Sequence, residues 1–161
     1  MLDAQVTHFM SRDLDSVIQQ REVDAVNEWL KSSKSFHVMR DHPYHFFEML
    51  GGMWGVKQFA EEKKAAMISL YHAANSTDLW SDETKWGPDQ IFLKKYIWPW
   101  ARKNSLSHDS YTCEKFPGSV PFPSQRNEER WNFVASLFMK ESILKMKCPL
   151  ACRKFEEWIF C

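Results

Sequence analysis

The sequence predicts an α/β fold, because segments with strand character and segments with helical character alternate along the first forty residues. Residues 5–10 have strand character, residues 16–30 carry a helical pattern, and residues 36–40 again favour a strand. The order strand, helix, strand is typical of α/β domains. With 161 residues, the chain is long enough for one domain with a hydrophobic core.

The composition is that of an ordinary globular protein and excludes some classes of function. The 21 basic and 21 acidic residues give a net charge of zero, whereas a nucleic-acid binder usually carries a basic excess. No apolar run approaches the ~20 residues that span a bilayer. The first residues also lack the basic and apolar regions of a signal peptide. We therefore expect no nucleic-acid partner and no membrane span in this chain.

The first helix is expected to begin in residues 16–19, where Ser-Val-Ile-Gln resembles a capping box. Its spacing predicts that Val23, Val26, Trp29 and Leu30 share the buried face. The polar side chains of the same helix are then expected to face solvent: Arg21, Glu22, Asp24, Asn27 and Glu28. The strand predicted over 36–40 runs into Pro43, which blocks a helix.

Three of the five glycines fall at positions 51, 52 and 55, which predicts a sharp bend or a close approach to a ligand. An amphipathic helix is expected over 56–74, with an inner stripe of Phe59, Ala66, Met67 and Leu70. Pro88 suits the first residue of a further helix, which would run to about residue 100. The remaining segments are expected to be a polar turn at 75–86, extended chain at 105–113, irregular chain at 115–125, a strand or helix at 131–139, and a Cys-containing helical tail at 140–161.

Asp13 and Asp15 follow the first predicted strand. Carboxylates at i and i+2 point to the same side of an extended chain, and together they can hold one hard divalent cation. A calcium-binding EF-hand loop is excluded, because its sixth and twelfth positions would be Ile18 and Asp24 instead of glycine and glutamate.

Several histidines and one aspartate have both structural and functional interpretations. His42 and His45 lack a third metal ligand nearby in the sequence, which favours stacking, capping or hydrogen bonding over a zinc site. The run 108–110 reads His-Asp-Ser, but adjacent side chains diverge and cannot form a hydrolase triad. His108 is either a single metal ligand or a surface histidine. Asp89 either stabilises a helix dipole or accepts a proton from a substrate hydroxyl.

The four cysteines leave two interpretations open. Cys113, Cys148, Cys152 and Cys161 form an even set that can form disulfides or remain free thiols. Their spacing is not that of a zinc finger.

The order of these motifs is more specific than any one of them. Arg-Asp-Leu-Asp-Ser at 12–16 is followed by Phe-His-Val-Met-Arg-Asp-His-Pro at 36–43, Gly-Gly-Met-Trp-Gly at 51–55, Asp-Gln at 89–90 and His-Asp-Ser at 108–110. Over residues 6–139 the chain resembles the C-terminal half of a GT-A-type, nucleotide-sugar-dependent glycosyltransferase. This resemblance implies a mixed sheet with flanking helices, and it leaves the tail at 140–161 outside.

The resemblance also implies a set of site residues. Asp13, Asp15 and His108 would hold a divalent metal, Mn2+ or alternatively Mg2+, on the diphosphate of a sugar nucleotide. Asp89 would be the acceptor-side carboxylate, and the catalytic base if the reaction inverts configuration. The remaining implied residues would bind the phosphates or shape the donor-sugar and acceptor pocket: Arg12, Arg40, Gly51, Gly52 and Trp54.

One departure from the family affects these expectations. The family binds the nucleotide on βαβ units that precede the Asp-x-Asp strand, whereas about eleven residues precede Arg12 here. We therefore expect a fragment or a shortened relative that has little transferase activity alone and a sheet edge available for self-association. The alternative is a non-catalytic binding or interaction module on the same scaffold. The family type and the cysteines favour the secretory pathway (Golgi or ER lumen) over the cytoplasm.

Overall fold

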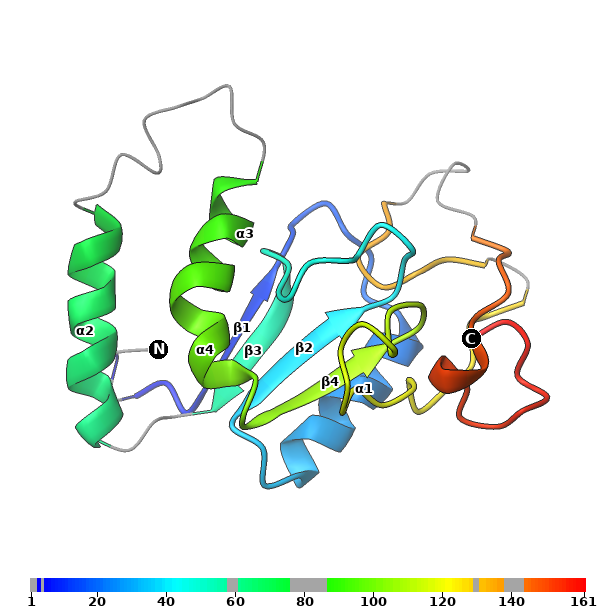
Figure 1. The fold of residues 1–161 in the computed structure, drawn as a ribbon, viewed down its shortest axis with the longest axis horizontal. Helices are drawn as coiled ribbons and strands as arrows, with labels where there is room; N and C mark the ends of the chain where they lie inside the picture. Colours follow the sequence, from blue (N-terminus) through cyan, green and yellow to red (C-terminus); the bar gives the residue numbers. More distant parts are fainter. Residues whose placement is uncertain (1–2, 4, 58–60, 76–86, 129–130, 138–143) are drawn as a thin grey trace.

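Four strands form one mixed sheet in the order β1–β3–β2–β4 (Figure 1). The structure is a computed structural model, and it describes residues 3, 5–57, 61–75, 87–128, 131–137 and 144–161. β3 runs antiparallel to both of its neighbours, and β2 runs parallel to β4, so β1, β2 and β4 all point the same way. The predicted α/β class with flanking helices is confirmed. The strands are β1 His8–Arg12, β2 Phe36–Arg40, β3 Met53–Lys57 and β4 Ser105–Asp109.

Helices cover both faces of the sheet (Figure 1). On one face, Ala25 of α1 (Gln20–Lys31) packs with Met39 and Met53. On the other face, α2 (Glu61–Asn75) and a continuous helical segment pack on Val38, Trp54 and Val56. That segment consists of α3 Pro88–Phe92, the π-helical η2 Leu93–Ile97 and α4 Trp98–Ala101. Within the described residues, no helix has the length and apolar character needed to cross a membrane.

The carboxyl ends of the three parallel strands meet at one end of the sheet. Asp13 follows β1, Asp41 follows β2 and Ser110 follows β4. In α/β sheets, ligands commonly bind outside the carboxyl ends of strands. A ligand site is therefore expected at this end of the sheet.

The prediction for the first helix was wrong in its start and in part of its buried face, although Trp29 is buried as predicted. α1 begins at Gln20, while the Ser16 hydroxyl donates to the Ala135 carbonyl at 3.2 Å instead of capping the helix. Val23 and Leu30 are exposed, whereas Arg21 and Glu22 are buried with Trp29 and Ala25. The reason is ionic: Arg21 pairs with Asp41, and Glu22 pairs with Arg12.

The helix predicted from residue 56 begins later, because residues 53–57 form the central strand β3. Val56 pairs with Phe9 on one side and with Phe36 on the other. The expected inner positions Met67 and Leu70 do lie against the core. Pro88 is the first residue of α3, as predicted. Phe59 and the polar turn at 76–86 lie outside the described residues.

The C-terminal part is irregular where a strand or helices were expected. Residues 131–137 form neither element, and the described tail contains a single 3-10 turn, η4 Leu150–Cys152. All four cysteines are paired, as Cys113–Cys152 and Cys148–Cys161. The first of these disulfides joins the tail to the chain just after β4. Covalent links therefore hold a tail that was expected to be helical and that forms a single 3-10 turn in its described part.

Candidate functional site

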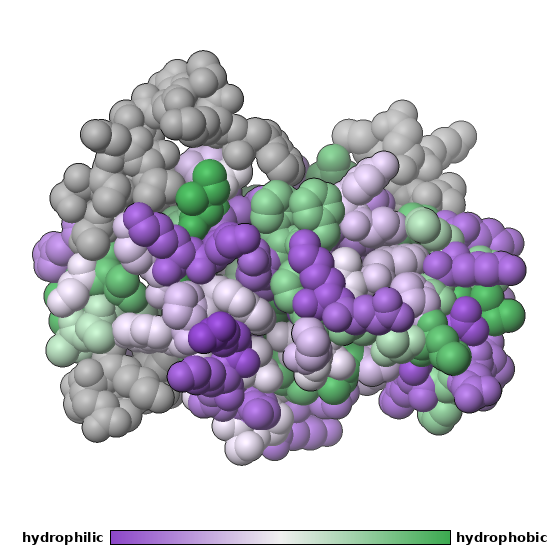
Figure 2. All heavy atoms as spheres, viewed as in Figure 1, coloured by the Kyte–Doolittle hydropathy of each residue, from purple (hydrophilic) through white to green (hydrophobic). Residues whose placement is uncertain are grey.

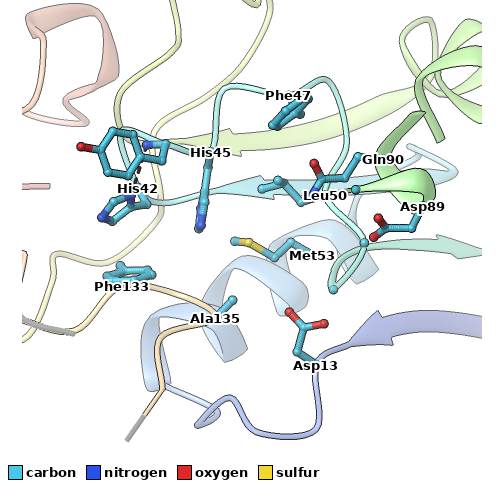
Figure 3. Close-up of a pocket in the computed structure, with 14 residues that line it drawn as sticks. Asp13, His42, His45, Phe47, Leu50, Met53, Asp89, Gln90, Phe133 and Ala135 are labelled. Atoms are coloured by element: carbon cyan, nitrogen blue, oxygen red, sulfur yellow. Dashed lines mark hydrogen bonds between the residues drawn. The ribbon is translucent and has the colours of Figure 1, made fainter. Parts of the chain in front are cut away.

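A cavity of about 470 Å³ lies at the carboxyl ends of β1 and β2 (Figure 3). Four separate segments line it: the turn after β1, the loop between β2 and β3, the start of α3, and the irregular segment that includes Phe133. The lining residues are Asp13, His42, Tyr44, His45, Phe47, Leu50, Gly51, Gly52, Met53, Gly87, Asp89, Gln90, Phe133 and Ala135.

Gly51 and Gly52 lie between two carboxylates. A Cβ atom added to Gly51 would overlap the carboxylate of Asp89, and one added to Gly52 would overlap the carboxylate of Asp13. The absence of a side chain at both positions therefore lets an acidic side chain approach the backbone closely. The sequence predicted Asp13, Gly51, Gly52 and Asp89 as site residues separately, and the structure brings all four into one cavity.

Asp13 and Asp15 belong to a turn and not to an extended strand. β1 ends at Arg12, and the Ser16 N–H donates to the Asp13 carbonyl at 3.4 Å across the turn. Both side chains are exposed, and neither carboxylate has a partner among the described residues. Asp13 lines the cavity, and Asp15 does not. Free carboxylate oxygens on a turn fit a hard divalent cation, which commonly takes one or two carboxylates plus substrate phosphates.

His108 does not join these carboxylates. It lies on the α1 side of β4, fully buried, with its Nδ1 2.9 Å from His37 Nε2 and its Nε2 3.5 Å from Glu28 Oε2. Strand alternation and the packing of α1 hold its ring there. The three-ligand metal site expected from the sequence is therefore not formed in the described residues. The group of three close ligand atoms that does occur there is Asp109 with Cys113 and Cys152, and its two sulfurs form a disulfide.

His42 and His45 form a wall of the cavity that sequence reasoning did not assign to the site. His42 Nδ1 accepts the Tyr44 N–H, and His45 Nδ1 accepts the Asp41 N–H, both at 3.1 Å. Each neutral ring therefore carries its proton on Nε2. Burial lowers the pKa of His42, and it lowers the pKa of His45 to about 4. Near pH 7 the cavity thus has two neutral imidazole donors.

An aromatic surface accompanies these donors. The Phe133 ring lies 4.5 Å from the His42 ring and 5.7 Å from the His45 ring, measured between centroids. In Figure 3 the two imidazoles and Phe133 lie on one side of the cavity, and Asp13 and Asp89 lie on the other. The arrangement sets hydrogen-bond donors and an apolar face opposite hydrogen-bond acceptors. The signal in the sequence was His-Pro-Tyr-His at 42–45, which follows the end of β2 after one intervening residue.

Arg40 and Trp54, which the sequence also predicted, lie outside the cavity. All three Arg40 nitrogens are used: Nε donates to Asp109 at 2.7 Å, Nη1 to the Glu48 carbonyl at 2.8 Å and Nη2 to Ser119 at 2.9 Å. Trp54 is 7% exposed and belongs to the core. Neither side chain is free for a ligand.

Arg12 keeps two unused donors but does not line the cavity. Its Nε pairs with Glu22 Oε1 at 2.9 Å. Its Nη1 and Nη2 are buried without a hydrogen-bond partner among the described residues.

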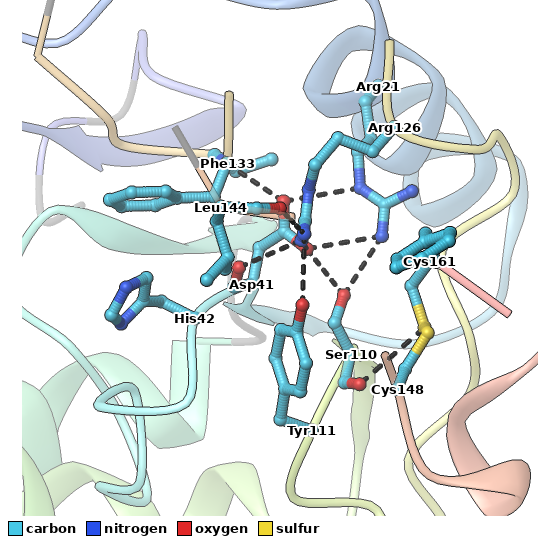
Figure 4. A network of polar contacts seen from close by, with 12 residues as sticks. Arg21, Asp41, His42, Ser110, Tyr111, Arg126, Phe133, Leu144, Cys148 and Cys161 are labelled. Carbon is cyan, nitrogen blue, oxygen red and sulfur yellow. Dashed lines mark hydrogen bonds and ion pairs between the residues drawn. A yellow bond between two sulfur atoms is a disulfide. The ribbon is translucent and has the colours of Figure 1, made fainter. Parts of the chain in front are cut away.

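A buried polar network around Asp41 supports the histidine wall (Figure 4). The Asp41 carboxylate accepts from Arg21 Nη2 at 3.1 Å, Arg126 Nη2 at 2.7 Å, the Ser110 hydroxyl and the Val134 N–H at 2.9 Å. Burial opposes its ionisation, but Arg21 and Arg126 outweigh that effect and hold the pKa of Asp41 below its usual value.

The same network fixes two chain segments of the cavity relative to each other. Asp41 directly precedes His42, and Val134 lies between Phe133 and Ala135. His42, Phe133 and Ala135 all line the cavity. The Arg126 N–H also donates to the carbonyl of Cys161, which connects the network to the disulfide-bonded tail. Sequence reasoning missed this network because its members are far apart in the chain, with Asp41 and Arg126 separated by 85 positions.

Comparison with protein-family models, with curated proteins and with solved structures gives no match to this chain.

Proposed function

We propose that this chain carries the metal-side and acceptor-side part of a nucleotide-sugar-dependent glycosyltransferase site. The observation that carries the proposal is the Gly51–Gly52 backbone held between the carboxylates of Asp13 and Asp89. Each carboxylate is unpaired among the described residues. One of them is then available for a cation and the other for a substrate hydroxyl.

Asp89 is the residue we assign to the acceptor. In the reaction, the hydroxyl oxygen of the acceptor forms a bond to the anomeric carbon of the donor sugar. The bond from that carbon to the diphosphate oxygen breaks, and Asp89 takes the hydroxyl proton. Asp89 lies in the first turn of α3, and it lines the cavity beside Gly51.

Asp13 and Asp15 are the residues that would hold a divalent cation, Mn2+ or Mg2+. Such a cation supplies positive charge to the departing nucleoside diphosphate. His108 has no part in this proposal, because its ring is buried between His37 and Glu28.

The histidine wall indicates the chemistry of the acceptor. The Nε2–H groups of His42 and His45 suit hydroxyl oxygens, and the Phe133 ring suits the apolar face of a sugar. Among the described residues the cavity lining includes no Lys or Arg. A neutral, hydroxyl-rich acceptor such as a glycan is therefore favoured over an anionic one. The two disulfides are consistent with an oxidising compartment such as the secretory pathway.

A second candidate is a non-catalytic saccharide-binding module on the same scaffold. The burial of His108, Arg40 and Trp54 away from the cavity favours it, since three residues expected at a transferase site are used structurally. This candidate needs the histidine wall and Phe133 but neither metal nor Asp89.

Release of nucleoside diphosphate from a panel of sugar nucleotides distinguishes the two candidates. With Mn2+ and simple glycosides as acceptors, we expect slow release that Asp89→Asn reduces at least ~100-fold. Glu157→Gln, which changes an exposed carboxylate in the tail, is the matched control and keeps the wild-type rate. Glycoside binding by folded protein with no release, or release that Asp89→Asn leaves unchanged, would contradict the transferase proposal.

A further inference from the structure

A second cavity, of about 580 Å³, lies at the outer edge of β4, and it is strongly basic. Four cationic residues line it: Lys34 from the turn before β2, Arg102 and Lys103 from the end of α4, and Lys115 from the loop after β4. No Asp or Glu is among its described lining residues. Figure 2 shows strongly hydrophilic side chains gathered over the junction of α4 and β4.

Three of these cations have no anionic partner within the described part of the chain. Among the described residues, no carboxylate pairs with Lys34, Arg102 or Lys103, and Lys115 Nζ donates to the Phe46 carbonyl at 2.8 Å. The whole chain has equal numbers of acidic and basic residues. Four like charges in one concave site therefore raise the local positive potential and attract an anion.

Hydroxyl groups on β4 and on the loop that follows it add hydrogen-bond donors to the cavity. Ser105 and Ser107 lie two residues apart on the strand, so they share one face, and their Oγ atoms are 3.2 Å apart. The Ser119 oxygen accepts from Arg40 Nη2, which leaves its own O–H free to donate. Cations and hydroxyl donors together are the groups that bind the oxygens of phosphate and sulfate.

Two aromatic rings complete the lining. Trp98 and Phe116 lie 6.3 Å apart between centroids, at an interplanar angle of 75°. The guanidinium of Arg40 stacks over Phe116 at 4.2 Å and holds that ring in place. Aromatic faces beside a positive site suit an anionic group carried on a ring rather than a bare inorganic ion.

Helix stabilisation explains only part of this cluster. Arg102 and Lys103 follow the carboxyl end of α4, where cations are favourable in any helix. Lys115 is held by the Phe46 carbonyl and by the rings of Phe46 and Phe116, whereas Lys34 comes from the turn before β2 and serves neither that helix end nor a described carboxylate. Their convergence on the same cavity is therefore better explained by a ligand.

We propose that this basic cavity binds the oxyanion of a sulfate or phosphate ester carried on a saccharide ring. The site is separate from the Gly51–Gly52 cavity and does not depend on the proposed transferase function. Its ligand is anionic, whereas the other cavity favours a neutral one.

Calorimetric titration without metal or nucleotide tests this proposal. The probes are N-acetylglucosamine 6-sulfate and glucose 6-phosphate, with inorganic sulfate, inorganic phosphate and the uncharged sugars as separate arms. We expect an ester to bind with a Kd of about 1 mM or tighter, more tightly than its inorganic ion, and more weakly as salt rises. The Lys34→Gln/Arg102→Gln double variant should weaken binding at least tenfold. The matched control Lys147→Gln removes an exposed tail lysine and should change binding less than twofold.

Failure of this proposal can be distinguished from failure of the transferase proposal, because Asp13→Ala/Asp15→Ala should leave ester binding unchanged. Absence of saturable ester binding by the folded wild type would overturn the proposal. Equal weakening by Lys147→Gln would overturn it too, since the effect would then reflect total charge. Equal affinity for the esters and the inorganic ions would refute the role of the aromatic rings.

Discussion

The two cavities of this protein differ in charge and in how the fold supports them. The Gly51–Gly52 cavity has acidic groups and neutral imidazoles, and a buried network around Asp41 fixes its walls. The basic cavity gathers cations on the outer edge of β4 that pair with no carboxylate among the described residues, and the buried Arg40 behind it contacts Ser119 and Phe116. Substitutions in the Asp41 network should therefore lower the free energy of unfolding. Substitutions of the surface cations of the basic cavity should change ligand binding with little change in that free energy. The following predictions test that difference.

The largest effect is expected from Asp41→Asn. The substitution leaves Arg21 and Arg126 buried without their shared carboxylate, so the free energy of unfolding should fall by about 3–5 kcal/mol. Urea denaturation measures this loss. Asp24→Asn, which alters an exposed contact with Gln20 on α1, is the control and should cost under about 1 kcal/mol. A small loss for Asp41→Asn would mean that the network does not support the cavity.

Acid should destabilise the protein through its buried histidines. The pKa values of His45 and His108 are each lowered to about 4, chiefly by burial, with Asp41 and His42 facing the first and Glu28 and Arg21 facing the second. A depressed histidine pKa means that the unfolded chain takes up protons first. Stability is then complete above about pH 6.5 and is lost as the pH falls toward 4, by on the order of 3 kcal/mol for each residue.

Denaturation curves measured between pH 7 and pH 4 check this dependence. His108→Gln should make the loss shallower, while His72→Gln, which changes an exposed histidine on α2, should leave the slope as it is. A free energy of unfolding that stays constant over this range would contradict the prediction.

Gly52→Ala should have an intermediate effect that depends on Asp13. The new methyl group would overlap the Asp13 carboxylate, and because that exposed side chain can move aside, the cost should be about 1 kcal/mol, at the lower end of the range for overpacking. In an Asp13→Ala background the cost should shrink, and a double-mutant cycle measured by urea denaturation gives the coupling. Additive effects of the two substitutions would show that the carboxylate does not contact this glycine.

The smallest effect is expected at the basic cavity. Lys34→Gln removes one of several like charges that have no carboxylate partner among the described residues, so the free energy of unfolding should stay the same or rise, within about 0.5 kcal/mol. Denaturation at low and high salt measures it, and any gain should disappear as salt screens the repulsion. A loss above about 1 kcal/mol would mean that Lys34 has a structural role and that the two cavities do not differ as described.

The sequence predicted local features better than long-range ones. The strand over 36–40, the helix start at Pro88 and the special backbone at Gly51 and Gly52 were predicted because each depends on neighbouring residues. The buried face of α1 was predicted wrongly, since periodicity assigns Arg21 and Glu22 to solvent unless their distant partners are known.

In the candidate site, too, individual residues were predicted better than the contacts between them. Asp13 and Asp89 were identified as site residues from the sequence, but their meeting on one loop depends on tertiary structure. His108 was expected at the metal because of its place in the motif order, and the register of β4 on β2 instead holds it beside Met39, on the α1 side of the sheet. The histidine wall and the Asp41 network required knowledge of contacts between residues more than 80 positions apart.

The most direct test of the central claim, that the carboxylates beside Gly51 and Gly52 form a reaction site, is a calorimetric titration of Mn2+ with and without a panel of nucleoside diphosphates. We predict that a diphosphate strengthens Mn2+ binding and that Asp13→Ala/Asp15→Ala abolishes it, whereas Glu156→Gln/Glu157→Gln, which alters two exposed tail carboxylates, does not. No binding by the folded wild type, or the same binding in the Asp13→Ala/Asp15→Ala variant, would contradict the claim.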